Sequence, residues 1–156
     1  MKIKKYIVQF VAVVILIMLM ISGGVSALAA TQRSTMFIDS QSSSITRTTN
    51  TELKVYYCVD SLATLDKLGV FSISIQRSSD QQTWQTESSF YYVNNPEFVD
   101  ENTCVHSGTL YYNGTRGYYY RAYIVFFASK DGSGEKTYMT TNSVYIPPLG
   151  NGGRTN

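Results

Sequence analysis

Hydrophobic and polar residues alternate with a period of two along much of the chain after residue 50. Residues 51–60 are the clearest example, because one face collects the apolar positions Leu53, Val55, Tyr57 and Val59. Such alternation predicts a half-buried antiparallel strand. Further strand-like runs begin near residues 70, 83, 103, 117 and 137, and the polar segment 39–49 carries Ile45 as its one apolar anchor. We therefore expect an all-β, antiparallel two-sheet sandwich of about seven strands.

The longest and most aromatic of these runs is residues 117–129. Its even positions, from Tyr118 to Ala128, are expected to face the core, because they exclude Arg121 and include both alanines. The odd positions then form an outward stripe too apolar for ordinary solvent-exposed surface: Tyr119, Arg121, Tyr123, Val125 and Phe127. Either the N-terminal leader covers this stripe, or it is a binding surface. The candidate binding residues are Tyr119, Arg121, Tyr123 and Phe127.

Three segments carry signals for turns or helices. Ser61–Gly69 is the helix-like stretch, since it starts with a good N-cap residue, ends with glycine and spaces its leucines by three. Gly108 is expected to mark a β-bulge. Asn113–Gly114 predicts a tight hairpin into the tyrosine-rich run.

The first 29 residues have the three parts of a helical secretory signal peptide. Met1–Lys5 is basic, Val11–Ile21 is an uninterrupted apolar run, and Ala27–Ala29 is a cleavage signal. We expect a secreted protein, with an uncleaved membrane anchor as the alternative. The expected divisions are a signal peptide (1–29), a polar extended leader or first strand (30–50), a β-sandwich domain (51–147) and a flexible tail (148–156).

The excess of basic over acidic residues in the chain comes from this targeting segment. Of 13 basic residues, Lys2, Lys4 and Lys5 lie before the cleavage site, which leaves ten against 11 acidic residues. The mature protein has no cluster of basic residues suited to nucleic acid. We expect neither a nucleic-acid partner nor a membrane contact after cleavage.

Two cysteines, Cys58 and Cys104, are the only ones in the chain. In a secreted protein such a pair most often forms one disulfide, which would stabilise the fold by about 4 kcal/mol through loop closure. The alternative is a catalytic thiol at Cys104, with His106 two residues away on the same face of a strand. The alternation places Cys58 opposite the aliphatic face of its strand.

Residues 73–84 run from a strand through a Ser/Asp turn to a tryptophan, and 118–122 and 141–144 follow in order. These segments resemble the third strand and the last two strands of fibronectin type III-like domains. The resemblance covers roughly residues 50–146 and implies an immunoglobulin-like sandwich in which Cys58 and Cys104 lie on neighbouring strands of one sheet. A disulfide is unusual in that family, and no proline-led first strand is recognisable. The whole chain also resembles small secreted proteins of Gram-positive bacteria with no assigned activity.

The residues form no catalytic constellation, no cofactor motif and no set of metal ligands, so we expect a non-enzyme without cofactor or metal. Doubled tyrosines put one ring on each face of a strand, which leaves several rings on an outer surface. Trp84 is expected to pack in the core at a sheet edge, with ligand stacking as the alternative.

Our first hypothesis for function is a secreted interaction or adhesion module that binds an extracellular protein or a cell-surface glycan. The alternatives are a small secreted toxin or antimicrobial effector stabilised by one disulfide, and a hydrolase that uses His106.

Overall fold

The computed structural model describes residues 36–149, which contain seven strands and one short 3-10 helix. The elements are β1 (Ser40–Arg47), β2 (Glu52–Ser78), β3 (Gln85–Tyr91), η1 (Pro96–Phe98), β4 (Val99–Asn113), β5 (Tyr118–Lys130), β6 (Ser133–Thr140) and β7 (Val144–Ile146). The expected signal peptide, its cleavage site and most of the expected tail lie outside these residues.

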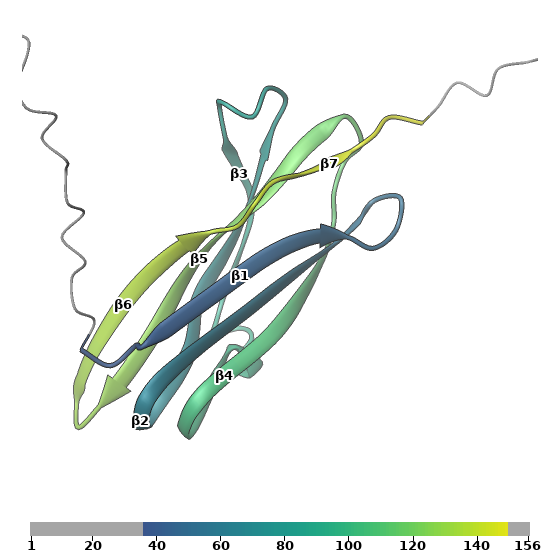
Figure 1. The fold of residues 1–156 in the computed structure, drawn as a ribbon. Coiled ribbons are helices and arrows are strands. Elements are labelled where there is room, and N and C mark those ends of the chain that lie inside the picture. The colour runs from purple at the N-terminus through teal and green to yellow at the C-terminus, as the bar shows by residue number, and fades with distance from the viewer. Residues whose placement is uncertain (1–35, 150–156) are drawn as a thin grey trace, which may run out of the picture. The chain divides into compact units, whose positions relative to one another are not determined.

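The sheet is built around β2 (Figure 1). Residues 52–60 of β2 pair with β1 along one edge and with β4 along the other. Residues 67–78 pair with β5, while β3 pairs with the opposite edge of this second half. β5 carries β6 and β7 on its far edge. The all-β, antiparallel prediction is thus confirmed, with seven strands in the described residues.

The two halves of the sheet are joined, whereas the sequence predicts two separate sheets. β2 runs without a break from the half that contains β1 and β4 to the half that contains β3 and β5. All seven strands therefore belong to one hydrogen-bonded sheet that curls on itself.

The helix predicted at 61–69 is wrong, because this segment is part of β2. The pairing with β4 is irregular between Asp60 and Leu65, and such an irregularity resets which residues face inward. Leu65 and Leu68 are buried on the inner side, while Leu62 is 87% exposed. Leu65 and Leu68 are three residues apart and both face inward, and this spacing is the one that resembles a helix turn.

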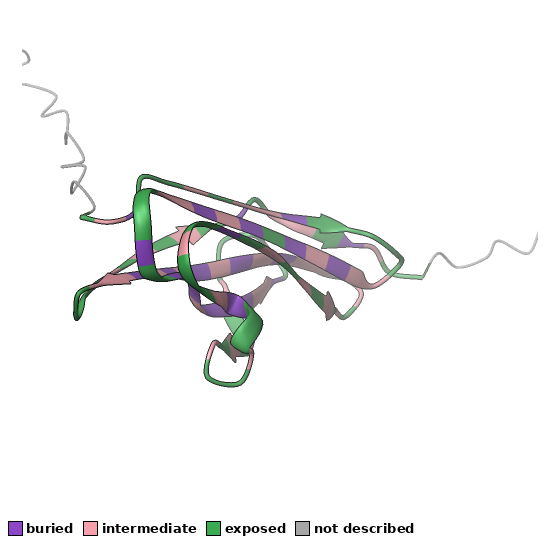
Figure 2. Ribbon diagram, turned by 90° about the horizontal axis from the view of Figure 1, so that it is seen from below, coloured by how far each residue is buried: buried purple, intermediate pink, exposed green. Residues whose placement is uncertain are grey.

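The core lies inside the curl, and buried residues appear at alternating positions along the strands (Figure 2). Of the predicted even face of β5, the positions from Tyr120 to Ala128 are fully buried, whereas Tyr118 is half-buried. The apolar face of β2 from Leu53 to Val59 is buried as well. Phe98 of η1 adds its ring, edge-on to Tyr57 at 5.9 Å between centroids. Each such side chain contributes about 1.5–3 kcal/mol by leaving water, so this interior is the main source of stability.

Side chains, without a backbone ladder, bridge the neighbouring edges of β1 and β6. The carboxylate of Glu135 accepts the consecutive backbone N–H groups of residues 36–38 at 2.6–2.8 Å. The amide of Asn142 accepts the Ile45 N–H at 3.1 Å and donates to the Ile45 carbonyl at 3.0 Å. The Asn142 side chain therefore makes the two bonds that a paired residue of an antiparallel strand would make.

The hairpin that Asn113–Gly114 predicts does not form. β4 and β5 pair with different parts of β2, and the Gly114 N–H donates to the Thr51 carbonyl at 2.9 Å. A Cβ at Gly114 would lie 2.7 Å from the side chain of Ile146, so close packing requires the glycine here.

Gly108 does not mark a bulge. It pairs in regular register with Tyr57, and a Cβ at this position would lie 2.3 Å from the Tyr57 hydroxyl oxygen. Because Gly108 has no side chain, the buried Tyr57 ring can lie directly over its backbone on the neighbouring strand.

We predict that Gly108→Ala destabilises the protein by about 1–3 kcal/mol, because the added methyl group displaces the Tyr57 ring. Urea unfolding followed by circular dichroism measures this change. Gly134→Ala is the matched control, since the nearest atom to a Cβ there is 3.3 Å away and the site is exposed. Equal stability of the two variants would contradict the prediction.

Candidate functional site

The outward stripe of β5 lies where the sequence predicts it. All five odd residues from Tyr119 to Phe127 are half-buried between the neighbouring strands β2, β6 and β7. β1 does not lie over the stripe, because it pairs with the other half of β2. Side chains from the adjacent strands therefore provide its partial burial.

Tyrosines of the stripe pair with tyrosines of the next strands. The ring of Tyr119 lies 4.7 Å from that of Tyr145 on β7, and Tyr123 stacks on Tyr138 of β6 at 6.0 Å. Tyr138 keeps 70% of its surface exposed. These pairs stabilise the sheet by about 0.2–1 kcal/mol each, and they also hold the rings in fixed positions at the surface.

Two cations on this face lie over aromatic rings. The guanidinium carbon of Arg121 is 4.1 Å from the centroid of the Trp84 ring, and Arg121 Nε donates to Gln76 Oε1 at 2.8 Å. Lys136 Nζ lies 3.2 Å from the centroid of Phe71. Cation–π contacts at exposed sites contribute about 0.5–1 kcal/mol.

The core position predicted for Trp84 is wrong. The indole is half-buried against the outward Arg121, and its Nε1 donates to the Gln81 carbonyl at 3.2 Å. The turn before β3 decides this position, because Trp84 precedes the strand and is not one of its alternating residues.

The carboxylate of Asp80 organises that turn. Its Oδ1 accepts the backbone N–H groups of Thr83 at 2.9 Å and Gln82 at 2.8 Å, and the hydroxyl of Ser78 at 2.8 Å. These hydrogen bonds, that from Thr83 first, lower the pKa of Asp80 to about 2.

We call the resulting surface the aromatic face. It combines rings and cations from β2, β5, β6, β7 and the turn before β3: Phe71, Trp84, Tyr119, Arg121, Tyr123, Phe127, Lys136, Tyr138 and Tyr145. The sequence predicted the members on β5 and gave Trp84 a stacking role only as the alternative to core packing. The others lie elsewhere in the chain, and the strand register alone brings them together. The side chains of this face suit contact and stacking, and none of them is a carboxylate, thiol or imidazole.

A second group of polar side chains lies between β2 and β3. Arg77 of β2 pairs with Glu87 of β3 at 3.2 Å, and the guanidinium carbon of Arg77 lies 4.9 Å from the Tyr118 ring centroid. Both charged side chains are partly buried, so this ion pair is less screened by water than a surface pair.

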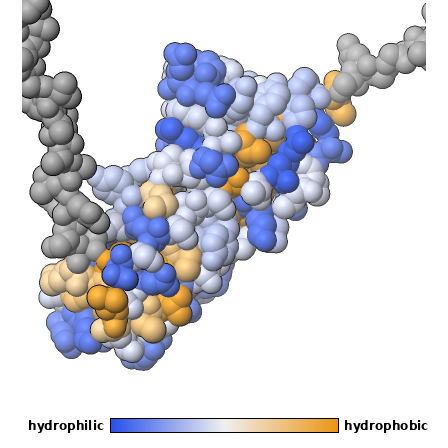
Figure 3. All heavy atoms as spheres, in the orientation of Figure 1, coloured by the Kyte–Doolittle hydropathy of each residue, from blue (hydrophilic) through white to orange (hydrophobic). Residues whose placement is uncertain are grey.

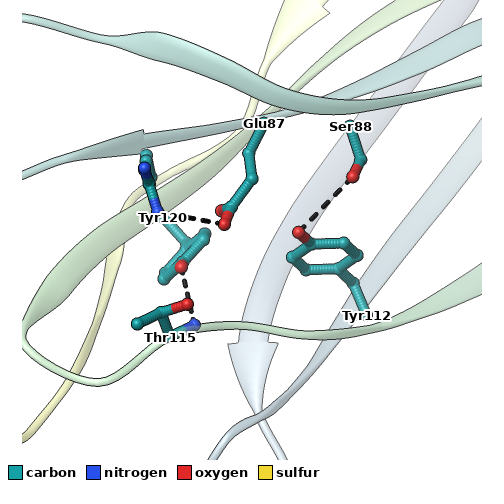
Figure 4. Close-up of polar contacts among 6 residues, drawn as sticks. Glu87, Ser88, Tyr112, Thr115 and Tyr120 are labelled. Carbon is teal, nitrogen blue, oxygen red and sulfur yellow. Dashed lines mark hydrogen bonds and ion pairs between the residues drawn. The ribbon is translucent and has the colours of Figure 1, made fainter.

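Beside Glu87, one hydrogen bond connects β3 to β4, and another connects the loop after β4 to Tyr120 of β5 (Figure 4). The Ser88 hydroxyl donates to the Tyr112 hydroxyl at 3.4 Å, and the Thr115 N–H donates to the Tyr120 hydroxyl at 2.7 Å. Burial raises the pKa of Tyr120, which keeps the phenol neutral. These contacts hold β3 near β4 although no ladder pairs the two strands, so we interpret them as structural.

The imidazole of His106 is buried, between Asp100 and Tyr57. Its Nδ1 lies 2.9 Å from Asp100 Oδ2, and its ring stacks on Tyr57 at 5.8 Å. Cys104 is exposed, and no hydrogen bond joins it to His106. The structure thus does not assemble the thiol–imidazole pair. Among residues 36–149, no three His, Cys, Asp or Glu side chains form a group that could hold a metal ion.

The predicted disulfide is not formed, and both cysteines are free thiols. They do lie on adjacent strands, and Cys58 faces outward as expected. However, Cys58 is opposite Ser107, three residues from Cys104, which is an offset of about 10 Å along the strand. This offset alone exceeds the roughly 7 Å between Cα atoms that a disulfide can bridge.

Exposed hydrophobic side chains gather at the end of the sheet where β2 bends (Figure 3). Met36, Leu62 and Val105 are 69%, 87% and 50% exposed. Acidic residues such as Asp39, Asp66 and Glu101 are also exposed near this end. The patch is therefore interrupted by charge.

We predict that the fluorescence of Trp84, the only tryptophan, changes in acid with a midpoint near pH 2. The lowered pKa means that ionised Asp80 stabilises the turn fully above about pH 4. This contribution is lost as the pH falls through about 2. Circular dichroism recorded in parallel separates this change from unfolding of the sheet. Asp80→Asn should abolish the transition, whereas a wild-type midpoint near 4 would contradict the assignment.

The chain matches no protein-family model, and no curated protein matches it significantly. In residues 36–149, no helix combines the length and the apolar character needed to span a membrane. The candidate function therefore follows from the residues of the aromatic face itself.

Proposed function

We propose that the protein is a secreted, non-catalytic interaction module whose aromatic face binds an extracellular protein. The observation that carries this proposal is the gathering of tyrosine, tryptophan and arginine side chains from three strands and a turn on one outward sheet face. These are the residue types enriched where proteins bind one another and where truncation weakens binding most.

The contacts within the face favour binding because they reduce the conformational entropy that its side chains lose on binding. Tyr123 is held by Tyr138, and Arg121 is held by Trp84 and Gln76. Side chains already ordered in the free protein lose little further rotamer entropy when a partner docks. Tyr138 and Tyr145 remain 70% and 40% exposed, so their rings keep surface that a partner can bury.

A cell-surface glycan is the other ligand class expected from the sequence. We favour a protein because both cations of the face are already engaged with rings and the face spreads over several strands. An extended, ordered surface with a few aromatic anchors is typical of protein interfaces.

We also propose that the domain is related to the fibronectin type III and immunoglobulin-like sandwiches. The support is the order of pairing: β1–β2–β4 follows the A-B-E order of such domains, and β2–β5–β6 follows C-F-G. Strands B and C would then be the two halves of β2, continuous through the bend. An experimental structure in which β4 pairs with β5 would refute this relationship.

Secretion rests on the sequence of residues 1–29. We expect protein recovered from the culture medium to begin at Ala30, which N-terminal sequencing measures directly. Recovery of intact Met1 in the membrane fraction would show retention by an uncleaved anchor.

We predict that Tyr123→Ser combined with Tyr138→Ser weakens partner binding at least about tenfold, because it removes one stacked pair from the face. The measurement is retention of an extracellular protein fraction and a cell-wall polysaccharide fraction on the immobilised protein.

Tyr56→Ser is the matched control, since Tyr56 is an exposed tyrosine on the other half of the sheet. The proposal is wrong if the double variant retains the same proteins as the wild type. Polysaccharide retention that depends on Tyr123 and Tyr138 would assign the face to a glycan instead.

A further inference from the structure

β4 has a long edge that no strand occupies. It pairs with β2 along one side over nearly its whole length. Among residues 36–149, no strand pairs with its other side, since β3 pairs only with β2. Backbone groups along such an edge are a template for another strand.

Three hydrogen bonds show which residues of β4 point to this edge. The Gly114 N–H donates to the Thr51 carbonyl of the β2 side, so even-numbered residues of β4 bond toward β2. The backbone N–H and carbonyl of Val105 are both bonded to the hydroxyl of its neighbour Thr103, and therefore point away from β2. By the alternation of an antiparallel ladder, the N–H and carbonyl groups of Ser107, Thr109 and Tyr111 also face the free edge.

From Ser107 to Asn113, this edge lacks the usual devices that block strand addition. Residues 102–113 contain no Asp, Glu, Lys, Arg or Pro, and the register from 105 to 113 is unbroken. By contrast, side chains bridge the edges of β1 and β6, and β3 is short and carries Glu87. β4 is thus the one long, regular and uncharged edge among the described residues.

We propose that the β4 edge pairs with the same edge of a second copy of this chain, antiparallel about a two-fold axis near Thr109. Self-pairing is compatible with the charge pattern, because like charges nowhere face each other in the uncharged segment. Asp100 and Glu101 lie at one end of β4, so an antiparallel arrangement places the acidic groups of the two copies at opposite ends. A parallel arrangement would align them side by side.

The outward side chains also suit this arrangement. With Thr109 on the axis, each Tyr111 lies opposite Ser107 of the other copy, a large ring beside a small side chain. The same register places Val105 opposite Asn113, at the ends of the contact. The interface is isologous and closes at two copies, joining β1–β2–β4 of each into one continuous sheet. It uses a different half of the sheet from the aromatic face, so the two proposals are independent.

The test is sedimentation velocity of the purified protein over a wide range of concentration. Thr109→Pro removes an N–H that points to the free edge, so it blocks the added strand without removing a bond to β2. Thr109→Lys places two like charges at the axis and tests the same contact without a backbone constraint. Ser42→Lys on β1 is the control, because Ser42 is exposed on the other side of β2.

We expect the wild type and Ser42→Lys to show the same concentration-dependent dimer. Thr109→Pro and Thr109→Lys should each weaken dimerisation at least about tenfold, with circular dichroism spectra like that of the wild type. A wild type that stays monomeric at every concentration overturns the proposal. A dimer that Thr109→Lys leaves unchanged overturns it as well, because the contact would then lie on another surface.

Discussion

The structure depends on the continuity of β2 through its bend. β2 supplies the hydrogen-bonding partner of β1, β3, β4 and β5, and only β6 and β7 pair elsewhere. A strand that long can serve both halves only if it changes which residues face inward, and the irregularity between Asp60 and Leu65 provides this change. The inward rings of Tyr57 on the first half and Tyr120 on the second are then enclosed by the same curl.

The curled sheet does not close, so it keeps free edges, and the contacts at these edges differ. On one side, Glu135 and Asn142 replace a ladder by bonding their side chains to the backbone of the segment that leads into β1 and of β1 itself. The carboxylate of Glu135 is well suited to this position, because charge-assisted bonds to backbone N–H groups are stronger than neutral ones. On the other side, side-chain contacts between β3 and β4 leave the outer edge of β4 open.

The aromatic face follows from the same geometry. Strand alternation places Tyr120 and Phe126 inside and Tyr123 and Phe127 outside. The outer rings are therefore a consequence of doubled aromatics on strands that have only one buried side. Aromatic residues on the neighbouring strands keep these rings ordered. This order stabilises the sheet and lowers the entropy lost when a partner binds.

How far the sequence predicts this structure differs from segment to segment. The two faces of β5 and of residues 53–59 were predictable, because regular alternation needs only local sterics and one buried side. The stripe from Tyr119 to Phe127 followed from the same rule. Ser61–Gly69, Asn113–Gly114 and Gly108 were misassigned, since their local signals describe isolated segments and the sheet gives each another role. The Gly108 site, for example, is determined by the Tyr57 ring across the strand.

The sequence by itself determined the all-β character and the buried faces of residues 53–59 and of β5. Only the tertiary structure decided that the two halves share β2, that Cys58 and Cys104 are out of register, and that Trp84 joins Arg121 at the surface. The reason is that alternation is a property of neighbouring residues, whereas register joins residues far apart in the chain. A shift of a few residues between β2 and β4 leaves the pattern of each strand unchanged and moves one cysteine out of reach of the other.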